Sequence, residues 1–466
     1  MGPNSADQHI TNTYNPKFTG LISWHKAIPA FLNGNDSPRN YLERCLETIE
    51  VHEPKIRAFV STDIPVARKA ADKASARYKN NQPLSVVDGM PFVVKDLYEV
   101  KGMPTELGSP AMRGYGGDKD CAHARVMREG GAVILGKTVT TEFGSSDPGP
   151  TRNPFDLNRT PGGSSSGTSA AVGAGMVPAG SGSQVRGSIL RPAGYCSNYA
   201  IKPTFGGLNR LGGHSMAPSQ SVLGIQAGSL EDVWNTAFYI SSKAGGDPGY
   251  PGLYGQPELG TTQKPNILIR LDTPGWQKTE DQTKAKFEDF LGLLKDAGVE
   301  IYSRYQDREI EDFEQILTTI PIFLRDLFCW EMQWPGKTQR DKGEHLISSA
   351  ILERISRGEE MAIEDYRKCL EMRGKLRNAF NHIKGKADAY ILLSAQGPAP
   401  LVSDGIGNPI YGDVSSCLAS PAYNLPILED CGLPMGVQIL AHPHQDFELG
   451  RIGKWLVDSF LSVPVK

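Results

Sequence analysis

The chain has 466 residues and a formal net charge of −3, and 39% of its residues are apolar and 22% are charged. This balance is ordinary for a soluble globular protein, and it argues against a protein that binds nucleic acid or a membrane surface. The length is sufficient for one large domain.

Neither a membrane span nor a secretion signal is predicted. No stretch approaches the roughly 20 apolar residues of a spanning helix, and residues 1–20 contain no apolar signal core. The seven cysteines are widely spread and form no CxxC pair, which favours a reducing compartment. We therefore expect a cytoplasmic protein. His442 and His444 are too isolated to predict a metal site, and nothing predicts an organic cofactor.

The first half of the chain alternates helices with short apolar strands. Residues 1–36 are expected to form a loosely docked arm with one short helix. Ser37 and Pro38 then have the pattern of a helix start, because serine caps the first turn and proline is tolerated at the first helical position. The further elements expected are a helix around 66–74, a strand ending at Lys95, a helix at 123–129 and a strand at 132–135. This alternation predicts a layered α/β fold.

A segment rich in Gly, Pro and Tyr at 245–260 predicts a long surface loop before the second half. The elements expected there are strands at 266–269, 299–302 and 389–393, helices at 287–294 and 366–383, and segments at 421–426 and 432–440 that end the layered core. Large apolar side chains gather at 313–334, including Phe323, Phe328, Trp330 and Trp334. Such a cluster is more typical of a core than of a binding pocket, but both interpretations stay open.

Residues 161–192 are dominated by Gly, Ser and Ala. Such a run is typical either of a flexible linker or of a tightly folded loop that brings backbone close to a ligand. Apolar residues are interleaved at 170–172, 176–179 and 185–190, which a solvated linker would lack. We therefore expect two serine-bearing turns packed against a small-residue helix, with at least one strand between them.

Two familiar motifs occur near this run, and neither has the context that it requires. Residues 163–167 match G-x-S-x-G, which would make Ser165 a hydrolase nucleophile, but that motif follows a strand and 153–160 reads as loop. Residues 131–138 match a phosphate-binding loop, but 132–135 is itself an apolar strand.

Lys95 ends an apolar run, which is an unusual place for a lysine. Burial favours the neutral amine, and a neutral amine can act as a general base. The alternative from this segment alone is that Lys95 pairs with Asp96 at the end of the strand.

Taken together, three segments resemble the amidase signature family. They are Gly-Gly-Ser-Ser at 162–165, Gly-Ser-Ile at 187–189 and Val-Lys-Asp at 94–96. The offset between Ser164 and Ser188 also matches that family. The resemblance covers most of the chain and is weakest at about 245–385.

The resemblance implies the fold and the domain organisation. It implies one α/β/α layered domain over 1–466, built around a large mixed β-sheet. The catalytic core would lie at 89–240, and the variable region at 245–385 would contribute to a substrate pocket.

The resemblance also implies the roles of three residues. Ser188 would be the nucleophile, Ser164 a bridging serine that follows a cis peptide bond, and Lys95 the base. A serine hydroxyl is a weak nucleophile until a base removes its proton, and here the proton would pass from Ser188 through Ser164 to Lys95.

The remaining site residues surround the two serines. The resemblance places an oxyanion hole at the backbone N–H groups of Val185, Arg186, Gly187 and Ser188. Gly163 makes the turn before Ser164 sterically easy and is expected beside the substrate.

This sequence departs from the usual family pattern at several positions. Gln184 and the displaced Arg191 resemble a variant branch of the family. Arg186 stands where many members have glycine, and it sets a long cation two residues before Ser188. We hypothesise that Arg186 faces the pocket and selects a carboxylate-bearing or otherwise electron-rich substrate. The alternative is that it turns away into a structural ion pair.

The predicted function is hydrolysis of a linear carboxylic amide to an acid and an amine or ammonia, through an acyl-enzyme and without a cofactor. The predicted partner is therefore a small-molecule amide, and the family's frequent homodimers make a homodimer plausible. One alternative is the amidase subunit of a glutamine-dependent amidotransferase, which would need a partner protein. Another is a non-catalytic binding protein of the same fold, which should lack one of Lys95, Ser164 and Ser188, whereas all three are present.

Overall fold

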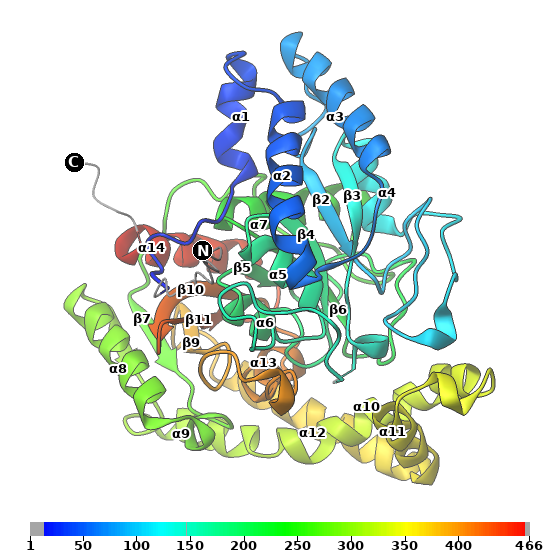
Figure 1. The fold of residues 1–466 in the computed structure, drawn as a ribbon. Coiled ribbons are helices and arrows are strands. Elements are labelled where there is room, and N and C mark those ends of the chain that lie inside the picture. Colours follow the sequence, from blue (N-terminus) through cyan, green and yellow to red (C-terminus); the bar gives the residue numbers. More distant parts are fainter. Residues whose placement is uncertain (1–13, 146, 462–466) are drawn as a thin grey trace, which may run out of the picture.

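In the computed structural model, which describes residues 14–145 and 147–461, eleven strands form one mixed β-sheet at the centre of the molecule (Figure 1). The strands are β1 Phe59–Thr62, β2 Pro91–Lys95, β3 Val133–Thr138, β4 Ala179–Gln184, β5 Tyr199–Lys202, β6 Val222–Ala227, β7 Ile267–Arg270, β8 Glu300–Tyr302, β9 Ala389–Leu393, β10 Ala422–Asp430 and β11 Leu433–Leu440. Their order across the sheet is β1-β3-β2-β4-β6-β5-β10-β11-β9-β7-β8.

The strand directions explain why the signature segments meet. β2 runs parallel to β3 and to β4, whereas β4 runs antiparallel to β6. Because parallel strands end at the same edge of a sheet, the end of β2 at Lys95 and the end of β4 at Gln184 lie at one edge. The loop that contains residues 185–189 leaves the sheet from this edge, beside the lysine.

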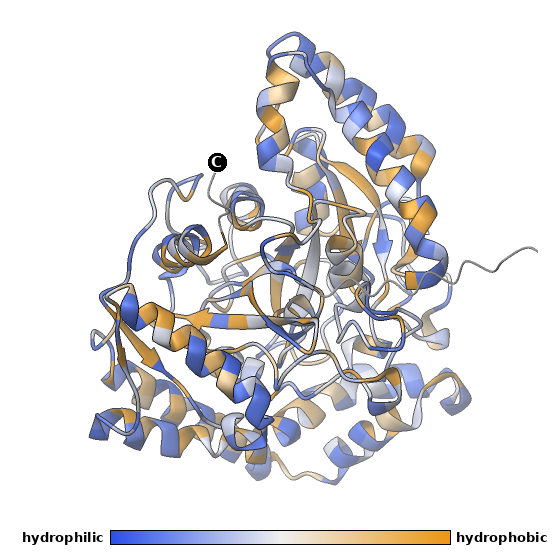
Figure 2. Cartoon of the chain, turned by 60° about the vertical axis from the view of Figure 1, so that its left-hand side comes forward, coloured by the Kyte–Doolittle hydropathy of each residue, from blue (hydrophilic) through white to orange (hydrophobic). Residues whose placement is uncertain are grey.

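Fourteen helices surround the sheet within the described residues. They are α1 Trp24–Leu32, α2 Pro38–Ile56, α3 Ile64–Lys79, α4 Ala122–Glu129, α5 Ser166–Gly173, α6 Leu190–Tyr195, α7 Leu230–Ala244, α8 Asp281–Asp296, α9 Arg308–Leu317, α10 Ile320–Arg340, α11 Ser349–Glu360, α12 Ile363–His382, α13 Ile410–Cys417 and α14 Asp446–Phe460. All residues of α5 and α6 are buried. Figure 2 shows apolar strands in the interior and outer helices with hydrophilic surfaces.

These elements confirm the predicted α/β fold around a large mixed sheet. α2 begins as expected, with Pro38 in its first turn and the Ser37 hydroxyl accepting a hydrogen bond from Asn40 N at 3.1 Å. β2 ends at Lys95, and no helix or strand interrupts the expected loop at 245–260. Several elements were not predicted, among them β1, β6, α7, α11, α13 and α14. Of these, α14 follows β11 and covers β10.

The N-terminal arm differs from the expected loose docking. Residues 1–13 of the arm lie outside the described part. The expected short helix is α1, and its Trp24 and Phe31 are almost fully buried. The backbone N–H of Trp24 also donates to the Asp232 carboxylate on α7 at 2.9 Å. The described part of the arm is therefore firmly packed, because its aromatic side chains lie in the core.

The aromatic segment at 313–334 divides between core, pocket and surface. Phe323 of α10 is 1% exposed and belongs to the core, whereas Trp334 of the same helix is 67% exposed. Phe328 lines two cavities, one beside Ser164 and one beside Ser188. Neither interpretation of the cluster therefore holds for all of its members.

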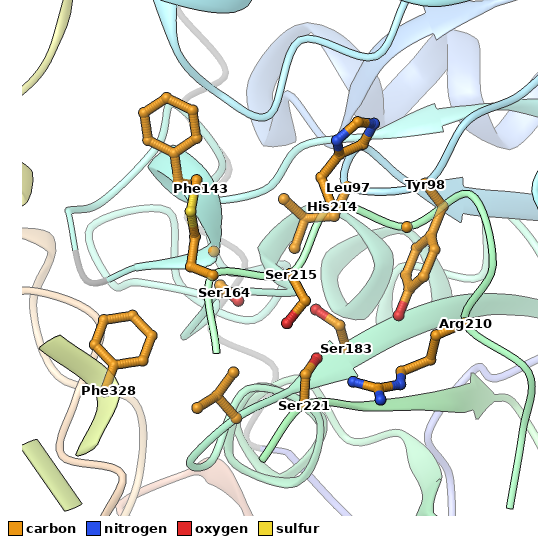
Figure 3. Close-up of a pocket in the computed structure, with 14 residues that line it drawn as sticks. Leu97, Tyr98, Phe143, Ser164, Ser183, Arg210, His214, Ser215, Ser221 and Phe328 are labelled. Atoms are coloured by element: carbon orange, nitrogen blue, oxygen red, sulfur yellow. The ribbon is translucent and has the colours of Figure 1, made fainter. Parts of the chain in front are cut away.

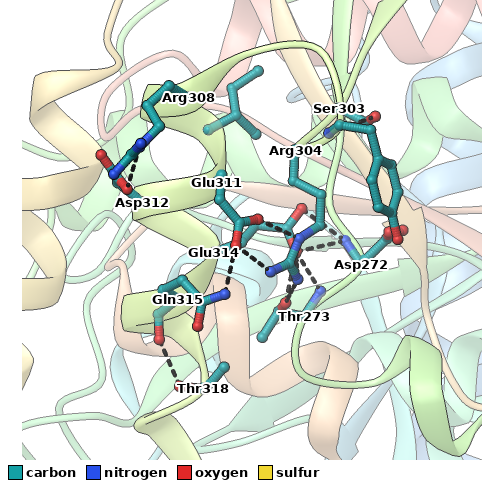
Figure 4. A network of polar contacts seen from close by, with 12 residues as sticks. Asp272, Thr273, Ser303, Arg304, Arg308, Glu311, Asp312, Glu314, Gln315 and Thr318 are labelled. Carbon is teal, nitrogen blue, oxygen red and sulfur yellow. Dashed lines mark hydrogen bonds and ion pairs between the residues drawn. The ribbon is translucent and has the colours of Figure 1, made fainter.

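A buried polar network fixes the end of β7 against α9 (Figure 4). The carboxylate of Glu314 is fully buried and accepts hydrogen bonds from Thr273 N at 2.9 Å and Thr273 Oγ1 at 2.6 Å. Arg304 lies 3.4 Å from Glu314 and forms a closer ion pair with Glu311. These bonds satisfy a carboxylate that would be costly to bury alone, so we regard the network as structural.

Among the described residues, no helix has both the length and the apolar character to cross a membrane. The seven cysteines are free thiols, and six of them are buried. The cytoplasmic location itself stays a prediction.

Candidate active site

Lys95 is the most deeply buried charged side chain of the predicted site, and three serine hydroxyls surround its amine. The side chain is 0% exposed. Its Nζ lies 2.7 Å from Ser164 Oγ, 2.9 Å from Ser183 Oγ and 3.0 Å from Ser165 Oγ. Burial, with a smaller contribution from the charge of Arg191, lowers the pKa of Lys95 well below its ordinary value. Both causes favour the neutral amine.

The alternative ion pair between Lys95 and Asp96 is not observed, because Asp96 pairs with Lys137 instead. Lys137 Nζ lies 2.7 Å from Asp96 Oδ1, and both side chains are fully buried. Lys137 also donates to Thr105 Oγ1 at 2.8 Å. Asp96 is therefore already paired.

Ser164 lies in a tight turn directly before α5. The peptide bond between Gly163 and Ser164 is cis, as the resemblance implied. A Cβ on Gly163 would lie 2.9 Å from Thr141 Cγ2 and 3.0 Å from Ile406 Cδ1, so the turn has no room for a larger residue. Two hydrogen bonds hold the backbone carbonyls of this turn. Thr141 N donates to Ser164 O at 3.2 Å, and Arg191 Nη2 donates to Gly163 O at 2.5 Å.

Ser188 lies in the loop between β4 and α6, where its side chain is partly exposed. The loop is closed by Gln184, whose side-chain oxygen accepts from Ile189 N at 2.9 Å and Leu190 N at 3.1 Å. The Ser188 carbonyl accepts from Ser165 N at 3.3 Å, which joins the two serine-bearing turns. The fold therefore brings Lys95, Ser164 and the Ser188 loop together at one edge of the sheet.

Arg186 has features of both predicted alternatives. Its guanidinium donates to Asp413 through Nε at 2.8 Å and through Nη2 at 2.6 Å, which is a bidentate ion pair. The Asp413 side chain is fully buried, whereas that of Arg186 is 34% exposed and lines the cavity that contains Ser188. A substrate would therefore meet a guanidinium whose charge is already paired.

Two cavities adjoin the serines, and Gly144, Val185 and Phe328 line both of them. The wide cavity has a volume of about 210 Å³ and is lined by Ser188. The narrow cavity has a volume of about 30 Å³ and contains Ser164 and Ser183. Figure 3 shows Phe143 and Phe328 at one side of the narrow cavity and Tyr98 and Arg210 at the other, with the hydroxyls of Ser183, Ser215 and Ser221 between them.

The wide cavity is lined in part by the region that the sequence analysis described as variable. Its remaining lining residues are Ser145, Arg186, Arg191, Arg325, Ala350, Glu353, Arg354, Ile406, Gly407 and Pro409. α10 and α11 contribute the members of this set between 325 and 354. These two helices pack as a pair (yellow in Figure 1).

Known proteins resemble this chain in sequence and in fold. The model of the family described as Amidase matches residues 40–449. The chain belongs to the amidase signature family. A crystal structure of an amidase superposes with a TM-score of 0.82 over 94% of this chain and 100% of that chain, and at 24% identity this likeness shows the fold alone.

The curated relatives in this family include components of amidotransferases. A glutamyl-tRNA(Gln) amidotransferase subunit from Anaeromyxobacter sp. (strain K) is 38% identical over 218 residues, which are 46% of this chain and 44% of that relative. The chain thus spans about half the length of the relatives it matches at this identity. The corresponding protein of the same name from Methanosphaera stadtmanae is 28% identical over 440 residues, which are 88% of this chain and 93% of that relative.

Sequence reasoning missed several residues of this amidase-family site. It dismissed Ser165 as a nucleophile without assigning it another role, and it did not single out Ser183, although both hydroxyls contact Lys95. The period of two along β4 places Ser181 and Ser183 on one face, and this signal could have found Ser183. Asp413 gave no such signal, because 227 residues separate it from Arg186.

Proposed function

We propose that the protein hydrolyses the amide bond of a small molecule through Ser188, with Ser164 and Lys95 as a proton relay. The observation that supports this most strongly is the environment of Lys95. Its amine is fully buried, its pKa is lowered, and it lies 2.7 Å from Ser164 Oγ. A neutral amine has a lone pair for the hydroxyl proton, whereas an ammonium group has none.

The proposed reaction has two halves. Ser188 Oγ attacks the amide carbon while its proton moves to Ser164, and the Ser164 proton moves to Lys95 Nζ. The C–N bond then breaks, and the relay returns a proton to the leaving amine. Water then attacks the resulting ester and gives a proton to the relay. The ester C–O bond breaks, the relay returns that proton to Ser188 Oγ, and the acid is released.

The oxyanion hole is proposed at the backbone N–H groups of residues 185–188. Two carbonyls of this segment are held, since Ser416 Oγ donates to Arg186 O at 2.7 Å and Arg191 N donates to Gly187 O at 3.0 Å. The C=O and N–H of a trans peptide point in opposite directions, so these bonds support N–H groups of Gly187 and Ser188 that face the other side. Loss of one oxyanion donor typically lowers the rate about 100- to 1,000-fold.

A fluorophosphonate probe tests the nucleophile directly, because it forms a covalent bond only with an activated serine. We expect intact-protein mass spectrometry to detect one label on the wild type. Ser188→Ala should abolish labelling, and Ser164→Ala and Lys95→Ala should slow it at least about 100-fold.

Ser166→Ala is the matched control for this experiment. Ser166 follows the same turn, but its hydroxyl donates to Val139 O at 3.2 Å, away from Lys95. This variant should label at the wild-type rate. A label that persists in Ser188→Ala, or a wild type that does not react, would refute the proposed nucleophile.

The amidase subunit of an amidotransferase is the second candidate, and the names of the curated relatives favour it. Such a component would be expected to release ammonia from glutamine and pass it to a partner's substrate. The isolated protein can be assayed for ammonia release from glutamine and from a panel of simple amides. Hydrolysis of simple amides without a partner supports the first candidate, and activity restricted to glutamine supports the second.

A further inference from the structure

The wide cavity beside Ser188 is rich in positive charge. Four arginines line it, namely Arg186, Arg191, Arg325 and Arg354, whereas Glu353 is the one carboxylate among its described lining residues. Asp413 lies behind Arg186 and balances that charge. The proposed substrate must therefore bind in a cavity that is lined by several guanidinium groups.

Arg191 adds a positive charge to the cavity. Among the described residues, its guanidinium bonds to backbone carbonyls rather than to a carboxylate. Arg191 is 2% exposed, and its guanidinium donates to the carbonyls of Gly163 and Gly407. Burial lowers the pKa of Arg191 to about 10, so it remains a cation at neutral pH. Since its Nη1 and Nη2 atoms hold backbone carbonyls, we assign Arg191 to the catalytic turn rather than to a ligand.

The remaining two arginines belong to the α10–α11 pair. Arg325 of α10 pairs with Glu353 of α11 at 2.6 Å, and both side chains are more than half exposed. An exposed ion pair of this kind is weak, so Arg325 can exchange its partner for a ligand. Arg354 donates to Ser145 Oγ, and its guanidinium lies 5.9 Å from the centre of the Phe328 ring. Both arginines therefore line the wide cavity together with Phe328.

The sizes of the two cavities indicate which part of the substrate lies where. The narrow cavity contains Ser164, which returns a proton to the leaving amine in the proposed mechanism. Its volume of about 30 Å³ is enough for ammonia or a very small amine. The acyl part must then extend into the wide cavity, toward Arg325 and Arg354.

We infer that the substrate is an amide whose acyl part ends in a carboxylate, and that Arg325 and Arg354 bind this carboxylate while its amide group lies at Ser188. The inference rests on the proposed function. Guanidinium groups are suited to carboxylates because their planar N–H donors match the two oxygens. A substrate with a neutral end would make no use of these donors.

Binding to the inactive Ser188→Ala variant tests the inference independently of catalysis. The probes are half-amides of straight-chain dicarboxylic acids, from succinic to suberic acid, and methyl-terminated amides of equal length. Calorimetry should show that at least one half-amide binds about tenfold or more tightly than its neutral counterpart. Arg325→Gln and Arg354→Gln in the Ser188→Ala background should each weaken this preference severalfold.

The ion pair between Arg325 and Glu353 also predicts a substitution that should strengthen half-amide binding. Glu353→Gln removes the carboxylate that competes with the ligand for Arg325, so half-amides should bind more tightly. Arg340→Gln is the matched control, because Arg340 forms an α10–α11 ion pair with Glu359 at 2.7 Å and is not among the described residues that line the cavity. This control should leave the preference unchanged.

The outcomes separate the two proposals. If half-amides of every length bind no better than neutral amides, the carboxylate site is refuted, whatever the labelling of Ser188. An equal effect of Arg340→Gln and Arg325→Gln would also refute it, because the helix pair would then matter through its packing alone. If half-amides bind as expected but wild-type Ser188 is not labelled, the proposed hydrolysis fails while the carboxylate site stands.

Discussion

The guanidinium of Arg191 donates to the carbonyl oxygen of Gly163 at 2.5 Å, directly before the cis bond that leads to Ser164. The same guanidinium contributes to the lowered pKa of Lys95. One buried arginine thus serves the proposed relay twice, because it positions the bridging serine and opposes protonation of the base.

The pH dependence of activity follows from the protonation state of Lys95. The amine must be neutral to accept a proton, so kcat/KM should rise with pH while Lys95 loses its proton. Because burial and Arg191 lower its pKa well below the ordinary value of 10.5, the rise should level off well before that pH. A pH profile measured with a neutral amide checks this. Activity that is highest in acid and falls toward neutral pH would exclude Lys95 as the base.

Arg191→Gln should move that profile. Loss of the nearby cation makes protonated Lys95 less unfavourable, so the pKa of Lys95 should rise and the ascending limb should shift to higher pH. A purely structural defect would lower activity at every pH without moving the limb. We expect a drop of about tenfold or more near neutral pH that is partly recovered in alkali.

Arg191→Lys provides the control for this experiment. It keeps a positive charge but loses the planar donors that hold Gly163 O, so it should lose activity with a smaller shift of the limb. An unchanged limb in Arg191→Gln would show that Arg191 acts on geometry alone.

Local patterns in the sequence predicted much of this site. The apolar run before Lys95 indicated the end of a strand, and the Gly- and Ser-rich run at 161–192 with its interleaved apolar residues indicated the two serine-bearing turns. Both depend on residues that are neighbours along the chain, where periodicity and turn chemistry are informative. α14 could have been predicted in the same way, because Leu449, Ile452 and Leu456 have helical spacing and are buried.

The rest depended on contacts between distant parts of the chain. No local pattern pairs Arg186 with Asp413, or predicts that Arg191 reaches the carbonyl of Gly163. The aromatic segment gave the same difficulty, since Phe323 and Phe328 lie on one helix but face the core and the cavity respectively. Which face of α10 meets the site is set by the packing of α10 against α11, and the composition of α10 does not reveal it.

Gly163→Ala should lower both stability and activity, although it adds only one methyl group. The added Cβ would lie 2.9 Å from Thr141 Cγ2 and 3.0 Å from Ile406 Cδ1, so the turn that carries Ser164 must move. Overpacking of this kind costs about 1–3 kcal/mol in stability, and displacement of Ser164 should lower kcat by about 100-fold. Thermal unfolding and steady-state kinetics measure the two effects.

Thr141→Ser offers a compensating change for this variant. It removes the Cγ2 methyl group and keeps the hydroxyl that donates to Ser145 O at 2.8 Å. The double variant should recover part of the lost activity. If Gly163→Ala alone were fully active, the close packing of this turn would not matter for catalysis.

The ion pair between Arg186 and Asp413 gives the last prediction. Arg186→Met leaves the fully buried Asp413 carboxylate without its partner, which should destabilise the protein by roughly 3 kcal/mol. Adding Asp413→Asn removes that charge and should restore most of the stability, as measured by chemical denaturation. The double variant also tests whether Arg186 selects acidic substrates. If Arg186 does so, the double variant should have a lower ratio of kcat/KM for acidic amides to kcat/KM for neutral amides than the wild type. An unchanged ratio would leave Arg186 with a structural role only, and the preference for a carboxylate would then depend on Arg325 and Arg354.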